Sequence, residues 1–256
     1  MIHMIYNWDN PQKVLFESPE LMVIGIATLL FIFLCLILGF RMIYRGIKVD
    51  YHTISYIGII FIGGGSLWSG VALNFLTILI FNVLPSWELH FLLHGGFIII
   101  ALFIGIIGVT DLINLQRKKR IIILIGLGIF MLILEIIYLS VIFIDYTILG
   151  IPIAPIQVKY QPFSWIYLTT ALVIFLSATG WFVLETFRSE IPQIQLQGKF
   201  LLNGGFLFLI GSIGEVYFSN IFILLISRFI VTIALFLGYI GFMMPEWVKK
   251  AFLKSL

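Results

Sequence analysis

The sequence predicts an all-α integral membrane protein, folded as a seven-transmembrane helix bundle with the N-terminus outside and the C-terminus in the cytoplasm. Hydrophobic residues make up 61% of the 256 residues and charged residues only 11%, and the mean hydropathy is +1.15. This composition leaves too little polar surface to face water on all sides, which excludes a soluble globular domain. The apolar residues also form runs of the length that crosses a bilayer, about 20 residues each.

Seven apolar runs divide the chain, and each is expected to be a helix because a helix satisfies its own backbone polar groups within lipid. The runs cover residues 21–43, 52–83, 88–110, 121–145, 163–186, 200–218 and 221–243. They define a short extracytoplasmic segment at 1–20, a transmembrane domain at 21–243 and a basic cytoplasmic tail at 244–256. The opening 20 residues lack a basic n-region, so we expect no cleavable signal peptide.

Lysine and arginine residues set the orientation. Twelve of them fall beside the helix ends of one side, while only Lys13 and Lys159 fall on the other. By the positive-inside rule the side with twelve is cytoplasmic. These twelve residues are Arg41, Arg45, Lys48, Arg117, Lys118, Lys119, Arg120, Arg188, Lys199, Lys249, Lys250 and Lys254.

Glycines mark two places where helices bend or pack closely. The second run is about ten residues too long for a straight crossing, and it contains GGGSLWSG at 63–70. We expect a kink near Gly63 to Gly65 or the close approach of a neighbouring helix there. The sixth run has further glycines that are expected to be packing contacts, namely Gly204, Gly205, Gly211 and Gly214.

Two connections differ in character. Residues 146–162 contain three prolines and are largely apolar, which predicts an ordered lid or an interfacial segment on the outer side. Residues 188–199 are polar and carry Pro192, which predicts a short solvated turn on the inner side.

The strongest functional signal is Arg228, which lies inside the last apolar run. An unpaired guanidinium in a membrane costs from about 3 to over 10 kcal/mol, so other helices should supply partners. Counting 1.5 Å per residue, Glu215, His94, Asn74 and Glu135 lie with Arg228 roughly 6–15 Å below the predicted outer helix ends. Tyr138 follows Glu135 on the same helical face.

These residues predict one polar cluster in the outer half of the bundle. Either Glu135 or Glu215 is expected to be the ionised partner of Arg228, which leaves the other carboxyl free to be protonated. Three interpretations stay open: an ion pair that holds helices in register, an outward-facing ligand pocket, and an ion or proton path.

A second signal is ELHFLLHGG at 88–96, where His90 and His94 are spaced i, i+4 and point to one helix face. Such a pair can give two ligands to zinc or another divalent metal, with a third from Glu135 or Glu215. The alternative is that both histidines only line the core.

Several seven-helix families resemble this layout. It is similar to that of rhodopsins and other seven-helix receptors, but residues 221–243 contain no lysine for a retinal Schiff base, which disfavours a retinal pigment. Seven-helix metal-dependent amide hydrolases also use histidines, from more than one helix, whereas both candidates here stand on the third. The ending SRFIV…GYIGFMMPEWVKK resembles the last helix of prokaryotic seven-helix proteins similar to sensor input domains.

The leading hypothesis is a receptor or sensor-type protein of the plasma (cytoplasmic) membrane. It would bind a small molecule or lipid in an outward-facing polar cavity and signal through a protein partner on its basic inner face. One alternative is a non-catalytic membrane subunit of a larger complex. The other is a metal-dependent or redox membrane enzyme that uses His90 and His94. The basic residues sit beside helix ends, so they do not indicate nucleic-acid binding.

Overall fold

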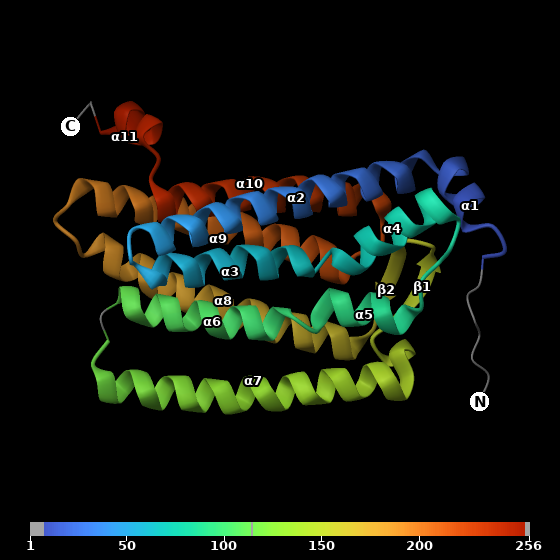
Figure 1. Cartoon of the computed structure of the whole chain (residues 1–256), viewed down its shortest axis with the longest axis horizontal. Helices are drawn as coiled ribbons and strands as arrows, with labels where there is room; N and C mark the ends of the chain where they lie inside the picture. The colour runs from blue at the N-terminus through green and yellow to red at the C-terminus, as the bar shows by residue number, and fades with distance from the viewer. Residues whose placement is uncertain (1–7, 114, 254–256) are drawn as a thin grey trace.

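The computed structural model describes residues 8–113 and 115–253, and almost all of them are helical (Figure 1). Residues 1–7 of the predicted outer segment and 254–256 of the predicted tail, with Lys254, lie outside the described residues. The elements are α1 (Pro11–Glu17), α2 (Pro19–Lys48), α3 (His52–Ser66), α4 (Ser69–Phe81), α5 (Trp87–Gly95), α6 (Ile98–Leu112), α7 (Arg117–Asp145), the 3₁₀ turn η1 (Tyr146–Ile148), β1 (Gly150–Ala154), β2 (Gln157–Tyr160), α8 (Pro162–Phe187), α9 (Pro192–Tyr217), α10 (Ile221–Met243) and α11 (Glu246–Phe252).

The described chain has the helices of a multi-pass membrane protein. Six segments are long and apolar enough to cross a membrane, if α5 and α6 count as one segment. The pair α3 and α4 passes the same test together, but it is bent by 53°. The six segments are Pro19–Lys48, Trp87–Leu112, Arg117–Ile148, Pro162–Phe187, Pro192–Tyr217 and Ile221–Met243.

The bend between α3 and α4 confirms the predicted kink in the second run. The helix stops at Ser66, and the chain turns through Leu67 and Trp68. The glycines before the bend also permit close packing, because a side chain at Gly63 would overlap Ala101 of α6. The predicted kink and the predicted close approach therefore occur together.

The third apolar run forms one membrane-length segment, Trp87–Leu112, as predicted, but its helix is interrupted. Helix α5 ends at Gly95 and α6 begins at Ile98, with Gly96 and Phe97 between them. A side chain at Gly95 would overlap the hydroxyl of Tyr138 on α7. The interruption therefore lies beside a close contact with α7.

Helices α9 and α10 are packed closely along their length. A side chain at Gly211 would overlap Val231, and one at Gly214 would overlap Ser227, which confirms these two glycines as packing contacts. The inner connection before α9 is shorter than predicted, because α9 already begins at Pro192. Proline is favoured in the first helical turn, where its missing N–H has no partner to lose.

The connection at 146–162 forms a small antiparallel hairpin, in which Gly150 pairs with Tyr160 and Pro152 with Val158. The segment is ordered, as predicted, but its strands were not foreseen and are the exception to an all-α fold. In Figure 1 the hairpin lies at the same end as α1, while the α2–α3, α6–α7 and α8–α9 connections and α11 lie at the other end.

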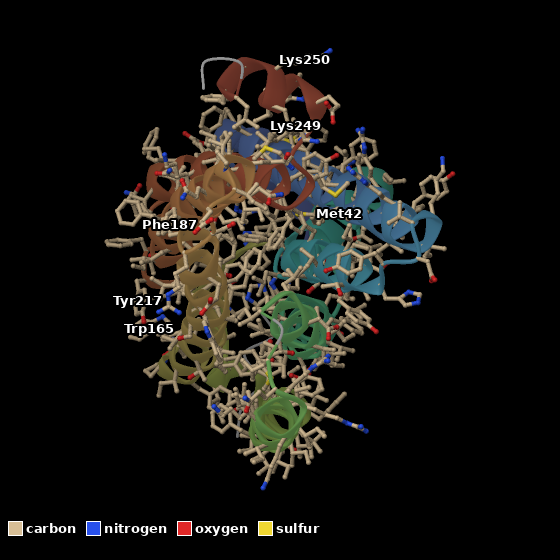
Figure 2. All side chains as sticks on the ribbon, turned by 90° about the vertical axis from the view of Figure 1, so that its left-hand side faces the viewer. Met42, Trp165, Phe187, Tyr217, Lys249 and Lys250 are labelled. Atoms are coloured by element: carbon tan, nitrogen blue, oxygen red, sulfur yellow. The ribbon has the colours of Figure 1, made fainter. Side chains whose placement is uncertain are left out.

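Seen along the bundle, α7 stands at one margin (Figure 2). Its buried residues are Met131, Glu135, Tyr138 and Ile142, which form one stripe facing α5, α6 and α8. Between residues 121 and 144 the other side chains of α7 are mostly apolar, and many of them are exposed, as expected for a helix that faces lipid.

Candidate functional site

Arg228 lies at the centre of a buried polar group formed by several helices. Its Nε donates to Glu215 Oε1 of α9, and its Nη1 donates to Thr28 Oγ1 of α2. Its guanidinium carbon also lies 5.4 Å from the ring centre of Trp68, in the bend between α3 and α4. Arg228 is 5% exposed and Glu215 9%, so the ion pair is removed from water.

The local sequence explains why Glu215 reaches Arg228. Gly214 precedes Glu215 and allows α9 to touch Ser227 of α10, next to Arg228. The Thr28 hydroxyl is oriented by its own helix, because it donates to the Ile24 carbonyl at 2.7 Å. It accepts a hydrogen bond from Arg228 at the same time. Of the two carboxyl groups that the sequence offered as counter-ion, Glu215 therefore fills the role.

Glu135 has a separate set of partners. The Tyr167 hydroxyl of α8 lies 2.8 Å from Glu135 Oε2 and 3.0 Å from the carbonyl oxygen of Gly95. The Tyr138 hydroxyl donates to the Phe91 carbonyl at 2.9 Å, and the Tyr138 and Tyr167 rings stack with their centres 4.2 Å apart. Glu135 thus joins α7 to α8 and to the α5–α6 break.

The geometry around Tyr167 fits a protonated Glu135. A phenolic hydroxyl has one proton, yet two acceptor oxygens lie within hydrogen-bonding distance of it. If Glu135 carries a proton, it donates to the Tyr167 oxygen, and Tyr167 then donates to Gly95. Both contacts become hydrogen bonds, and a charge without an ionic partner is avoided.

The two histidines stack on one another, with ring centres 6.3 Å apart and planes 14° apart. His94 Nδ1 lies 3.5 Å from the Tyr160 hydroxyl of β2, and His94 Nε2 has no hydrogen-bond partner among the described atoms. The predicted third metal ligands are engaged elsewhere, Glu215 with Arg228 and Glu135 with Tyr167. No group of three His, Cys, Asp or Glu residues in the described chain is arranged to hold a metal ion.

Asn74 is fully buried between α4 and the hairpin. Its Nδ2 donates to the Pro155 carbonyl at 3.1 Å, which attaches the hairpin to α4. The residues predicted as one cluster are therefore divided among three groups: Arg228 with Glu215, Glu135 with Tyr138, and Asn74 with the hairpin. His94 lies between the first two.

A cavity of about 390 Å³ lies beside the Arg228 pair, and its walls come mainly from α3, α6, α8, α9 and α10. His94, Glu215 and Trp68 lie on its lining, whereas Arg228, Glu135, Asn74 and Tyr138 do not. The lining is mostly apolar, which corrects the expectation of a polar cavity. Arg228, Glu215 and Glu135 bond to other side chains, and apolar residues make up most of the cavity lining.

The cavity is long and has one polar end. On α9 its lining extends from Leu201 to Tyr217, which is about 24 Å of helix, and on α10 from Val231 to Phe242, about 17 Å. Glu215 and Tyr160 mark its end under the hairpin. This length exceeds the ~15 Å of one leaflet's hydrocarbon.

Four residues of the site were not predicted: Thr28, Trp68, Tyr160 and Tyr167. Thr28 carries a weak signal, since it is a hydroxyl within the first apolar run, and Trp68 lies in the glycine-rich stretch that was noted for its kink. Tyr160 and Tyr167 look like ordinary interfacial aromatic residues in the sequence.

Burial and the nearby Glu215 carboxylate raise the pKa of Tyr160, so its hydroxyl stays protonated. It can then both donate and accept a hydrogen bond at the end of the cavity. Comparison with protein-family models, curated proteins and solved structures gave no match to this chain.

Proposed function

We propose that the chain is a seven-helix membrane receptor or sensor that binds a lipid-like molecule inside its bundle. The single observation that carries the proposal is the long apolar cavity with a polar end at Glu215, His94 and Tyr160. A cavity of about 390 Å³ is within the range of small-molecule sites, about 300–1,000 Å³. Its apolar walls favour a hydrocarbon chain over a small polar ligand.

In this proposal α3 and α4 together form one span, which brings the number of spans to seven. The N-terminus lies outside and the C-terminus in the cytoplasm of the plasma (cytoplasmic) membrane. The basic residues support this orientation, because Lys48 ends α2, Arg117 begins α7, and Lys249 and Lys250 lie on α11. These elements meet at the bundle end opposite the hairpin (Figure 1).

The basic inner end is also where a protein partner would bind. Its connections are short, and the described chain has no separate soluble domain beyond the helices. A signal that a ligand is bound in the cavity would therefore have to be transmitted to another protein. Helices α8, α9 and α10, which line the cavity, run from its polar end to this inner end.

Filling the cavity with a side chain tests the proposal. A Cβ at Gly64 meets no atom within 4 Å, and one at Gly205 meets only Leu176 at 3.9 Å, although both residues line the cavity. Gly64→Leu and Gly205→Leu should therefore fold yet weaken lipid binding about tenfold or more, since overfilling a site costs ~1–3 kcal/mol. Gly180→Leu is the matched control, because Gly180 also has open space but lies outside the lining.

The measurement is native mass spectrometry of the purified protein with co-purified and added lipids. The unaltered chain and Gly180→Leu should retain a bound lipid mass that Gly64→Leu and Gly205→Leu lose. Equal lipid retention by all four proteins would refute a ligand in this cavity.

A second candidate is a membrane subunit of a larger complex, which the marginal position of α7 favours. Only one stripe of α7 is buried, so most of its surface is free to meet another protein. Native mass spectrometry of gently extracted membranes separates the two functions. A fixed partner at constant stoichiometry would support the subunit, and a lone chain with bound lipid would oppose it.

A further inference from the structure

The polar end of the cavity shows which headgroup it suits. Glu215 is the one Asp, Glu, Lys or Arg residue among the described residues that line the cavity. Its carboxylate is already paired with Arg228, which lies behind it and off the lining. The cavity end therefore carries two opposite charges that neutralise one another.

A charged headgroup would meet no free counter-charge here. An anionic group would face the Glu215 carboxylate, and a cationic group would have to compete with Arg228 for it. Neither arrangement is favourable, because an added charge without a partner in a water-poor site costs several kcal/mol. His94 does not change this balance, since no Asp or Glu within the described chain lies within 4.0 Å of its ring nitrogens.

Two neutral groups at this end remain available for hydrogen bonding. His94 is 6% exposed, lines the cavity, and has no hydrogen-bond partner for Nε2 among the described atoms. The Leu67 backbone is a nearby hydrogen-bonding group for the His94 ring, but their contact lacks normal hydrogen-bond geometry. The Tyr160 hydroxyl lies 3.5 Å from His94 Nδ1, which is a long and weak contact.

We propose that the cavity binds an uncharged long-chain lipid whose headgroup carries a hydroxyl or carbonyl oxygen, held by Tyr160 and His94. A hydroxyl or carbonyl oxygen can bond to both side chains, because each can donate or accept according to its rotamer or tautomer. The inference rests on the proposed function, and it adds the chemical class of the ligand. Fatty alcohols, diacylglycerols and prenylated quinones belong to this class.

Trp68 provides a fluorescent reporter, because it lines the cavity and packs against Phe31 with ring centres 4.6 Å apart. We would place the full chain in lipid nanodiscs and titrate four dibrominated probes with the same chain: octadecanol, octadecyl sulfate, octadecyl trimethylammonium and octadecane. Bromine quenches tryptophan at short range. The chain has six tryptophans. The quenching measured in Trp68→Phe comes from the other five, and subtracting it from the quenching of the unaltered chain gives the part due to Trp68.

We expect the alcohol to quench Trp68 specifically. The mole fraction of alcohol required should be at least about tenfold lower than that of either charged probe. Equal binding of all probes, or tighter binding of a charged probe, would overturn the headgroup assignment and leave the lipid cavity in place. If no probe quenches Trp68 specifically, the proposed function itself is refuted.

A pair of tyrosine variants tests the hydrogen bond. Tyr160→Phe should weaken the alcohol about 3- to 10-fold, the value of one hydrogen bond, and leave octadecane unchanged. Tyr239→Phe removes the hydroxyl of another buried tyrosine, which lies outside the lining, and should change the binding of neither probe. An equal loss of alcohol and octadecane in Tyr160→Phe would show that Tyr160 only shapes the wall, which would overturn its role.

Discussion

Replacing Arg228 by methionine leaves the Glu215 carboxylate buried without its counter-ion. Methionine keeps the apolar stem, so the change removes mainly the guanidinium and its bonds to Glu215 and Thr28. Breaking a buried ion pair from one side costs about 3–5 kcal/mol of unfolding free energy. Glu215→Met should cost a similar amount, because it leaves the guanidinium unpaired in a membrane-length helix.

The double variant Arg228→Met, Glu215→Met measures the interaction between the two residues apart from their contacts with other residues. It leaves no buried charge at this position, so we expect it to lie within about 2 kcal/mol of the unaltered protein, far from the sum of the two single losses. Arg188→Met is the matched control. Arg188 donates to Glu185 at 2.8 Å on the surface, and such exposed pairs contribute about 0.5 kcal/mol or less.

The assay uses the single cysteine of the chain. Cys35 is 0% exposed, so a fluorogenic maleimide reacts with it when the bundle opens during an SDS titration. Two results would refute the view that this ion pair is isolated from water. One is a double variant whose loss of unfolding free energy equals the sum of the two single losses, and the other is a loss below about 1 kcal/mol for Arg228→Met.

Two further substitutions test other parts of the site. Glu135→Gln should change stability by less than about 1 kcal/mol, because an amide can donate to the Tyr167 oxygen as a protonated carboxyl does, whereas Glu135→Leu should cost about 1–3 kcal/mol. Equal effects of both changes in the same SDS titration would contradict a neutral hydrogen-bonded Glu135. Gly214→Val should lower the free energy of unfolding by about 1–3 kcal/mol or more, because the new side chain would overlap Ser227. Gly180→Val is the control: a Cβ at Gly180 meets no atom within 4 Å, so the free energy of unfolding should change by less than about 1 kcal/mol.

The sequence predicted an ion pair for Arg228 but left Glu135 and Glu215 open as its partner. Glu215 and Arg228 are 13 residues apart, on helices joined by a short connection. Helices joined in this way are usually adjacent, which favours Glu215. The cost of an unpaired arginine then leaves few other arrangements.

The Glu135 network was not predictable for the opposite reason. Its partner Tyr167 is 32 residues away on α8, and the η1 turn and the β1–β2 hairpin lie between α7 and α8. The path of this longer connection decides which faces of the two helices meet, and it does not follow from the apolar pattern. The α5–α6 break is a similar case, because Gly95 and Gly96 look the same in the sequence as the glycines that only pack. The position of Tyr160 depends on how the outer connection folds, which no pattern of apolar residues determines.

Two hydrogen bonds from side chains to backbone carbonyls attach the β1–β2 hairpin to the bundle. Asn74 binds the Pro155 carbonyl, and Gln157 Nε2 donates to the Ser219 carbonyl at 2.7 Å. In the proposed function, a hydrocarbon chain that enters while both bonds hold would come sideways out of the bilayer. Its occupancy would then follow its mole fraction among the neighbouring lipids, not its concentration in water. A receptor filled in this way would report the composition of the membrane around it, and a change in that composition would alter its state without any dissolved signal.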